Sequence, residues 1–83
     1  MPYSAADTEL KATRAWVEDG WVCVRLSDER EIRFPAAKNP RLRKGAPEQV
    51  ARIEIICAGT GLHWPDLDED LSVRGIIEGR IGA

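Results

Sequence analysis

Apolar and polar residues alternate along residues 10–34 with the two-residue period of a β-strand that buries one face. The dipeptide Asp19-Gly20 interrupts this alternation, and it suits the positive backbone dihedrals of a tight hairpin turn. A two-residue loop there pairs Val17 with Val22 on one apolar face. The pattern therefore predicts a hairpin of two strands, at about 10–18 and 21–27.

The register of this hairpin assigns the other residues to its two faces. The apolar face also pairs Ala15 with Val24 and Thr13 with Leu26. The opposite face carries Trp16 and Trp21, with Arg14 and Arg25 beside them. If no further element covers that face, its large rigid rings and arginines have the composition of a protein-binding hot spot or a homodimer surface.

A third strand at about 31–35 follows the turn Asp28-Glu29-Arg30. A three-residue loop pairs Leu26 with Ile32 and Val24 with Phe34, which keeps the apolar face continuous. Val17, Val22, Val24, Leu26, Ile32 and Phe34 are therefore expected in the core.

Beyond Pro35 the expected elements are short. We expect an irregular basic connector over 36–46, a helix at about 47–52, a buried fourth strand at 53–58 and a last helix at about 72–78 capped by Ser72. The predicted fold class is α+β: a small antiparallel sheet, made of a three-strand meander plus one further strand, with two short helices.

The chain has 83 residues, which suits one domain. We expect a flexible arm over 1–9, the domain over 10–79 and a tail over 80–83. No stretch approaches the roughly 20 apolar residues of a membrane span, and no signal peptide is evident, so a cytoplasmic location is expected. Cys23 and Cys57 lie in apolar runs and are expected to be reduced core residues.

The basic residues Lys38, Arg41, Arg43 and Lys44 cluster in the connector, although the net charge is −2. Such a cluster offers a modest footprint for phosphates. The net acidity, and the lack of an aromatic platform in the same segment, argue against nucleic acid as the partner.

An acidic run follows Pro65 and contains Asp66, Asp68, Glu69 and Asp70, alternating with Leu67 and Leu71. Inward leucines would fix outward acids, making a rigid surface for a basic partner. The same acids could instead pair with the basic connector. The spacing begins like a calcium loop, but it lacks that loop's glycine and final glutamate, and no zinc-ligand pattern is present, so no metal or cofactor is expected.

His63 and Asp66 form the one candidate acid–base pair. Catalysis also requires a nucleophile or a substrate pocket, and Ser72, Thr60 and Cys57 lie in no known nucleophile motif. We therefore expect His63 to be a half-buried residue at a strand end that hydrogen-bonds to backbone or to an acid, and we expect no enzymatic activity.

The segment 61–75, G-L-H-W-P-D-L-D-E-D-L-S-V-R-G, resembles the hallmark of a small bacterial family of unknown function with the motif G-I-H-W-P-D-L-D-E-D-[IL]-S-V. The hairpin turn, P-R-L at 40–42 and A-P-E at 46–48 match the layout of that family, although Lys38-Asn39 replaces its usual aromatic pair. The resemblance implies a non-catalytic, antitoxin-like domain that neutralises a small partner protein. The alternative is a phage-borne, anti-CRISPR-type inhibitor of a bacterial defence complex.

Overall fold

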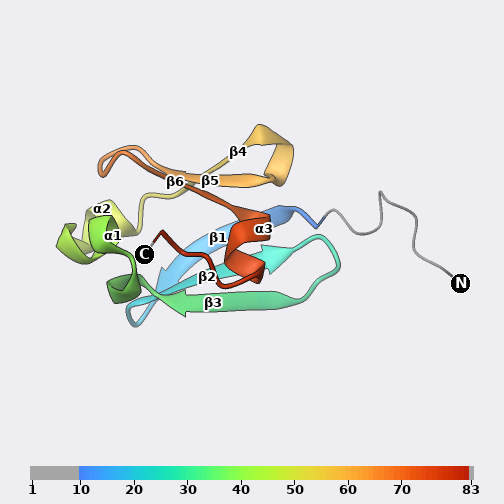
Figure 1. Cartoon of the computed structure of the whole chain (residues 1–83), viewed down its shortest axis with the longest axis horizontal. Helices are drawn as coiled ribbons and strands as arrows, with labels where there is room; N and C mark the ends of the chain where they lie inside the picture. The colour runs from blue at the N-terminus through green and yellow to red at the C-terminus, as the bar shows by residue number, and fades with distance from the viewer. Residues whose placement is uncertain (1–9, 83) are drawn as a thin grey trace, which may run out of the picture.

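The computed structural model describes residues 10–82 and contains two three-stranded antiparallel sheets, one above the other (Figure 1). Sheet A, with the order β1-β2-β3, contains β1 (Ala12–Glu18), β2 (Trp21–Leu26) and β3 (Glu31–Pro35). Sheet B, with the order β4-β5-β6, contains β4 (Glu54–Ile56), β5 (Gly61–Trp64) and β6 (Glu69–Ser72). The helices are α1 (Pro40–Lys44), α2 (Pro47–Val50) and α3 (Val73–Ile77), and the 3-10 turns are η2 (Ala36–Lys38) and η3 (Cys57–Gly59).

The first hairpin has the predicted turn. Asp19 and Gly20 take φ values of 51° and 82°, and Val17 lies opposite Val22. Towards the start of β1 the register shifts, so that Ala12 and not Thr13 lies opposite Leu26. The prediction of a Thr13–Leu26 pair was therefore wrong, because the irregularity turns the small Ala12 side chain into the core.

The second hairpin keeps the predicted faces but not the predicted partners. Val24 lies opposite Ile32 and Val22 opposite Phe34, two residues away from the expected register. The loop is centred one residue earlier than expected, because the Leu26 N–H donates to the Arg30 carbonyl (2.8 Å) and Glu29 takes the positive φ of 73°. A slip of two residues preserves the alternation of side chains, so Phe34 is still buried and Ile32 still packs against the core.

The core lies between the two sheets and draws on almost every element. Val22, Val24 and Leu26 from β2 contribute to the same buried cluster as Leu62 and Trp64 from β5. The indole N–H of Trp64 donates to the Val50 carbonyl (2.9 Å), so the largest buried side chain keeps its polar atom satisfied. The cluster is completed by Ala12, Phe34, Ala36, Leu42, Val50, Leu71, Val73 and Ile76.

The sheet arrangement differs from the expected one. The predicted fourth strand at 53–58 is reduced to Glu54–Ile56, and it joins β5 and β6 in a separate sheet. It is an edge strand with Ile55 39% exposed, so the expectation of a buried strand was wrong. A run of β-branched residues indicates strand geometry but cannot show how many neighbours the strand will have.

The helices also number one more than expected. The predicted irregular connector contains α1, because the Asn39 side chain caps it and Pro40 opens its first turn. The helix predicted at 47–52 is present as Pro47–Val50. The last helix is capped as predicted, with the Ser72 hydroxyl oxygen accepting from the Gly75 N–H (2.9 Å).

Residues 80–82 return to the domain: the Arg80 N–H donates to the Gly75 carbonyl (2.7 Å) and Ile81 packs against the core. The predicted arm at 1–9 lies outside the described residues. Among the helices of residues 10–82, none is long and apolar enough to cross a membrane.

Candidate protein-interaction surface

The outer face of sheet A carries both tryptophans of the first hairpin. Trp16 lies opposite Cys23, and Trp21 lies opposite Glu18 on β1 and Pro35 on β3. Sheet B and the helices α1–α3 lie towards the other side of sheet A (Figure 1), and Trp21 is 40% exposed. We call this surface the tryptophan face; it comprises Arg14, Trp16, Glu18, Trp21, Cys23, Arg25, Glu31, Arg33 and Pro35.

Trp16 is held in place by its neighbours along β1. The Arg14 guanidinium carbon lies 4.8 Å from the centroid of the indole ring, within the range of a cation–π contact. The indole N–H donates to a Glu18 carboxylate oxygen at 3.4 Å. These contacts restrict the rotamers of the ring before any partner arrives, which lowers the entropy lost on binding.

Cys23 forms an apolar floor beneath this face. Its side chain is fully buried, although it points to the same side of β2 as Trp21. Burial raises the pKa of the Cys23 thiol, and the nearby Arg33 charge opposes this only in part. The thiol therefore stays protonated and behaves as a small hydrophobic group. Cys57, by contrast, is exposed in η3, so the expectation that both cysteines lie in the core was wrong for Cys57.

The charged residues of the face leave an excess of positive charge. Arg25 forms an ion pair with Glu31 on the neighbouring strand. Arg33 forms no ion pair within residues 10–82. An aromatic surface surrounded by arginines suits a partner that offers apolar groups with acidic residues around them.

The acidic run forms the β5–β6 hairpin, and its acids are engaged within the molecule. Asp66 pairs with Arg52 (3.3 Å), and the Asp68 backbone carbonyl accepts from Arg41 (2.8 Å). Glu69 accepts from the Asn39 amide (2.9 Å). Leu67 packs against the core and Leu71 is buried, as the inside–outside pattern predicted. Part of the run thus contacts the basic connector, one of the two alternatives raised by the sequence.

Asn39 is the residue that sequence reasoning missed. It is fully buried, its side-chain oxygen accepts from the N–H groups of Arg41 and Leu42 (both 3.0 Å), and its amide donates to Glu69 and to the Ile81 carbonyl (2.8 Å). The dipeptide Asn39-Pro40 is a recognisable helix start, and this signal could have identified α1. Because Asn39 is internal, it cannot contact a partner directly.

His63 pairs with Asp70 and not with the predicted Asp66. The two residues lie opposite each other on β5 and β6, and the imidazole Nδ1 is 2.5 Å from an Asp70 oxygen. This hydrogen bond raises the pKa of His63, although partial desolvation opposes the rise. The candidate hydroxyls are engaged elsewhere: Ser72 caps α3, and Thr60 donates to the Cys57 carbonyl (2.8 Å). The arrangement is that of a cross-strand polar pair.

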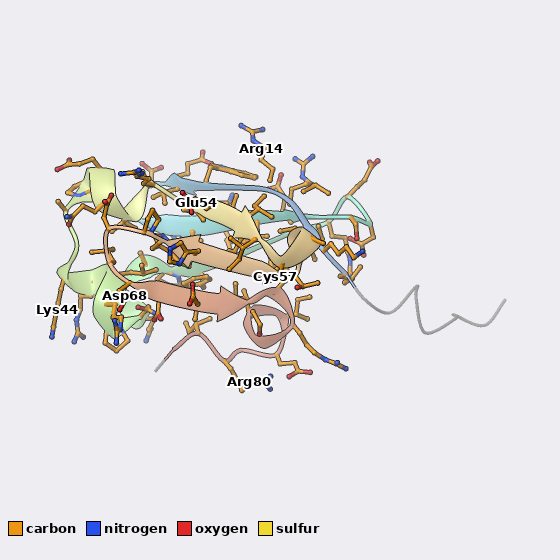
Figure 2. The ribbon with its side chains drawn as sticks, turned by 90° about the horizontal axis from the view of Figure 1, so that it is seen from above. Arg14, Lys44, Glu54, Cys57, Asp68 and Arg80 are labelled. Atoms are coloured by element: carbon orange, nitrogen blue, oxygen red, sulfur yellow. The ribbon has the colours of Figure 1, made fainter. Side chains whose placement is uncertain are left out.

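The basic residues of the connector lie on other elements than the tryptophan face. Lys38 belongs to η2, and Arg41, Arg43 and Lys44 belong to α1. Figure 2 shows Lys44 and Asp68 at the same end of the molecule. Sequence reasoning therefore named three groups of residues: the tryptophan face on sheet A, and the acidic hairpin and the basic helix, which meet through Arg41 and Asp68.

Comparison with known proteins identifies the family of this α+β domain. Residues 12–82 match the model of a family described as "Protein of unknown function (DUF2442)". The match covers most of the chain, so the protein belongs to this family, and the predicted membership of a family of unknown function is confirmed. A search of the curated proteins finds none that matches.

Two solved structures share the fold. A protein of unknown function from Rhodospirillum rubrum ATCC 11170 is 32% identical with a TM-score of 0.84, and the match covers 92% of this chain and 94% of that one. The uncharacterized protein CV0863 from Chromobacterium violaceum is 29% identical with a TM-score of 0.76, and the match covers 88% of this chain and 69% of that one. Both structures support the α+β fold.

Proposed function

We propose that this protein is a non-catalytic protein-binding module and that the tryptophan face is its binding surface. The observation that carries the proposal is the pair Trp16 and Trp21 on a sheet face that the described helices leave open. Large, partly exposed rings held by Arg14 and Glu18 supply contact area at little entropic cost.

The partner that this surface fits is a small protein, which the module neutralises in the manner of an antitoxin by covering its working surface. The excess of arginine on the tryptophan face favours a partner with acidic groups around an apolar patch. A second copy of this chain and a subunit of a defence complex are the competing occupants; sedimentation below tests the first, and a partner whose toxicity is not relieved favours the second.

The test compares tryptophan variants with variants of similarly exposed apolar residues elsewhere. Ile55 and Ile77 are 39% and 43% exposed, against 40% for Trp21, and neither belongs to the tryptophan face. We expect Trp16→Ala and Trp21→Ala to weaken binding of the small partner protein, to be sought among the products of neighbouring genes, at least about tenfold, a loss of about 1.4 kcal/mol. Ile55→Ala and Ile77→Ala should bind as the parent does.

Three measurements complete the experiment. Circular dichroism verifies that each variant folds, titration calorimetry measures binding, and a growth assay shows whether co-expression relieves toxicity of the partner. Sedimentation of the chain alone shows whether the same variants disrupt a homodimer. If both tryptophan variants fold, assemble and bind like the parent, the tryptophan face is not the binding surface and the acidic hairpin at 66–70 takes its place.

A further inference from the structure

A second surface feature lies at the end of the molecule formed by the β1–β2 turn, α1 and α2. It is a hollow of about 350 Å³, lined by apolar groups from four elements, among them Val17, Leu42, Pro47 and Val50. Arg43 contributes the charged part of the lining. The volume lies at the low end of the roughly 300–1,000 Å³ that is usual for ligand sites, so the hollow has room for one bulky side chain.

Arg43 is the charged residue of the lining, and the chain neighbours of lining residues include both the cations Lys38 and Lys44 and the acids Asp19 and Glu48. Lys38, Arg43 and Lys44 are exposed, and within the described part of the chain they form no ion pair. The other arginine of α1, Arg41, is engaged by the acidic hairpin. An apolar hollow with an unpaired arginine in its lining is complementary to an apolar group that carries an anionic neighbour.

The hollow adjoins the tryptophan face. Gly20, which lines it, precedes Trp21, and the Gly20 carbonyl accepts from the N–H of Ala36, another lining residue (2.9 Å). The next pair along the same two strands is Trp21 opposite Pro35, on the tryptophan face. A single extended partner segment can therefore reach both surfaces by passing around the end of sheet A.

We propose that the hollow receives one large apolar side chain of a partner polypeptide whose flanking residues are acidic. The apolar side chain fills the space between α1, α2 and the β1–β2 turn, and a flanking carboxylate pairs with the Arg43 guanidinium. This inference rests on the proposed protein-binding function, because it adds a specificity pocket to the partner surface that begins at Trp21.

The direct test uses a capped pentapeptide with a central leucine and acidic residues on both sides, titrated into the isotope-labelled full chain. We expect amide shifts in the residues that line the hollow, weakened by added salt because exposed charge pairs are screened. A peptide with alanine at the centre and one with lysines in place of the acids serve as controls, and both should bind at least about tenfold more weakly, or about 1.4 kcal/mol.

Two variants assign the contacts. Arg43→Glu reverses the charge of an exposed lining residue, and Ala37→Leu places bulk at the exposed part of the lining. Each should abolish the shifts, whereas Arg74→Glu, at an exposed position of α3 outside the hollow and the tryptophan face, should leave them unchanged. Equal binding of all three peptides, shifts confined to other residues, or no shifts at millimolar peptide would each overturn the proposal.

The same variants separate this inference from the function on which it rests. If Trp21→Ala loses the protein partner while Arg43→Glu binds it as the parent does, the tryptophan face is the binding surface and the hollow contributes nothing. If the tryptophan variants bind the protein partner as the parent does, the tryptophan face is not the binding surface, and the peptide titration then tests the hollow by itself.

Discussion

Asn39 is a single side chain on which three segments of the chain depend. Its oxygen caps α1, and its amide group donates to Glu69 on β6 and to the Ile81 carbonyl. Each of these groups loses a partner when the amide is removed. Because Asn39 is fully buried, water cannot replace the lost hydrogen bonds without a local opening of the structure.

Asn39→Ala should therefore destabilise the domain more than the substitution of other polar residues outside the apolar core. The lost helix cap alone costs about 0.5–2 kcal/mol, and leaving a buried carbonyl unpaired costs about 1–3 kcal/mol more. Urea unfolding measures the difference in free energy. The neighbouring exposed Lys38→Ala is the control, and a loss no larger in Asn39→Ala than in Lys38→Ala would contradict the role given to this amide.

The pairing of His63 with Asp70 predicts that the stability of the domain depends on pH. Its pKa in the folded state is raised above the ordinary value of 6.5, first by the hydrogen bond to Asp70 and also by the charges of Asp70 and Glu54. The folded state therefore holds the proton more tightly than the unfolded state. The stability that this pair contributes is complete below pH 6.5 and is lost as the pH rises through the raised pKa.

An NMR titration of the imidazole checks this prediction. Asp70→Asn should lower the pKa of His63, whereas Asp66→Asn should leave it in place. The opposite result would restore the His63–Asp66 pair that local spacing suggested. Sequence spacing failed here because Asp66 is three residues from His63 in the chain, whereas Asp70 faces it only once β5 and β6 pair.

Among the elements, the β5–β6 hairpin is the clearest case of leucines turned inward and acids turned outward. Leu67 packs against the core at Gly45, where an added Cβ would lie 2.7 Å from a Leu67 methyl carbon. The Asp68 side chain is 96% exposed and its backbone has a φ of 52°. Packing and charge are thus carried by adjacent residues of one turn.

Leu67→Ala should lower the melting temperature clearly. The free energy of unfolding should fall by an amount near the lower end of the roughly 2–5 kcal/mol that truncating a buried leucine costs, because Leu67 is only partly buried. Asp68→Asn, which keeps a side chain tolerant of positive φ, should change it little. Thermal unfolding of both variants is the measurement. Similar losses in the two variants would mean that the turn is held by its charges and not by its leucine.

The elements also show what periodicity can and cannot predict. The faces of β2 and β3, and of β1 from Arg14 onward, were predicted correctly because alternation survives a slip of two residues, although the β2–β3 partners were not. The helix α1 was missed because five residues are too few for a helical period, and a capping asparagine was its one signal. The edge position of β4 depends on neighbours that are distant in sequence.

For the whole molecule, the predicted class α+β is correct and the predicted single sheet is not. Strands of three or four residues, such as β4, β5 and β6, carry too little pattern to show which strands share a sheet. Their joining turns use positive φ at Cys57, Ala58 and Asp68, none of which is glycine. The candidate residues could likewise be named from sequence, but which of these groups contact one another required the fold.

The hydrogen bond between Asn39 and the distant Ile81 carbonyl also affects how the protein folds during synthesis. On the ribosome, β1, β2 and β3 can pair as soon as each emerges, since their contacts are local in sequence. The Asn39 amide, however, must wait for a carbonyl that lies 42 residues later in translation. Until then α1 is capped by the Asn39 oxygen, but it lacks the hydrogen bond from Asn39 to the Ile81 carbonyl. During synthesis, chaperones and proteases therefore meet a formed first sheet before the second sheet is locked against it.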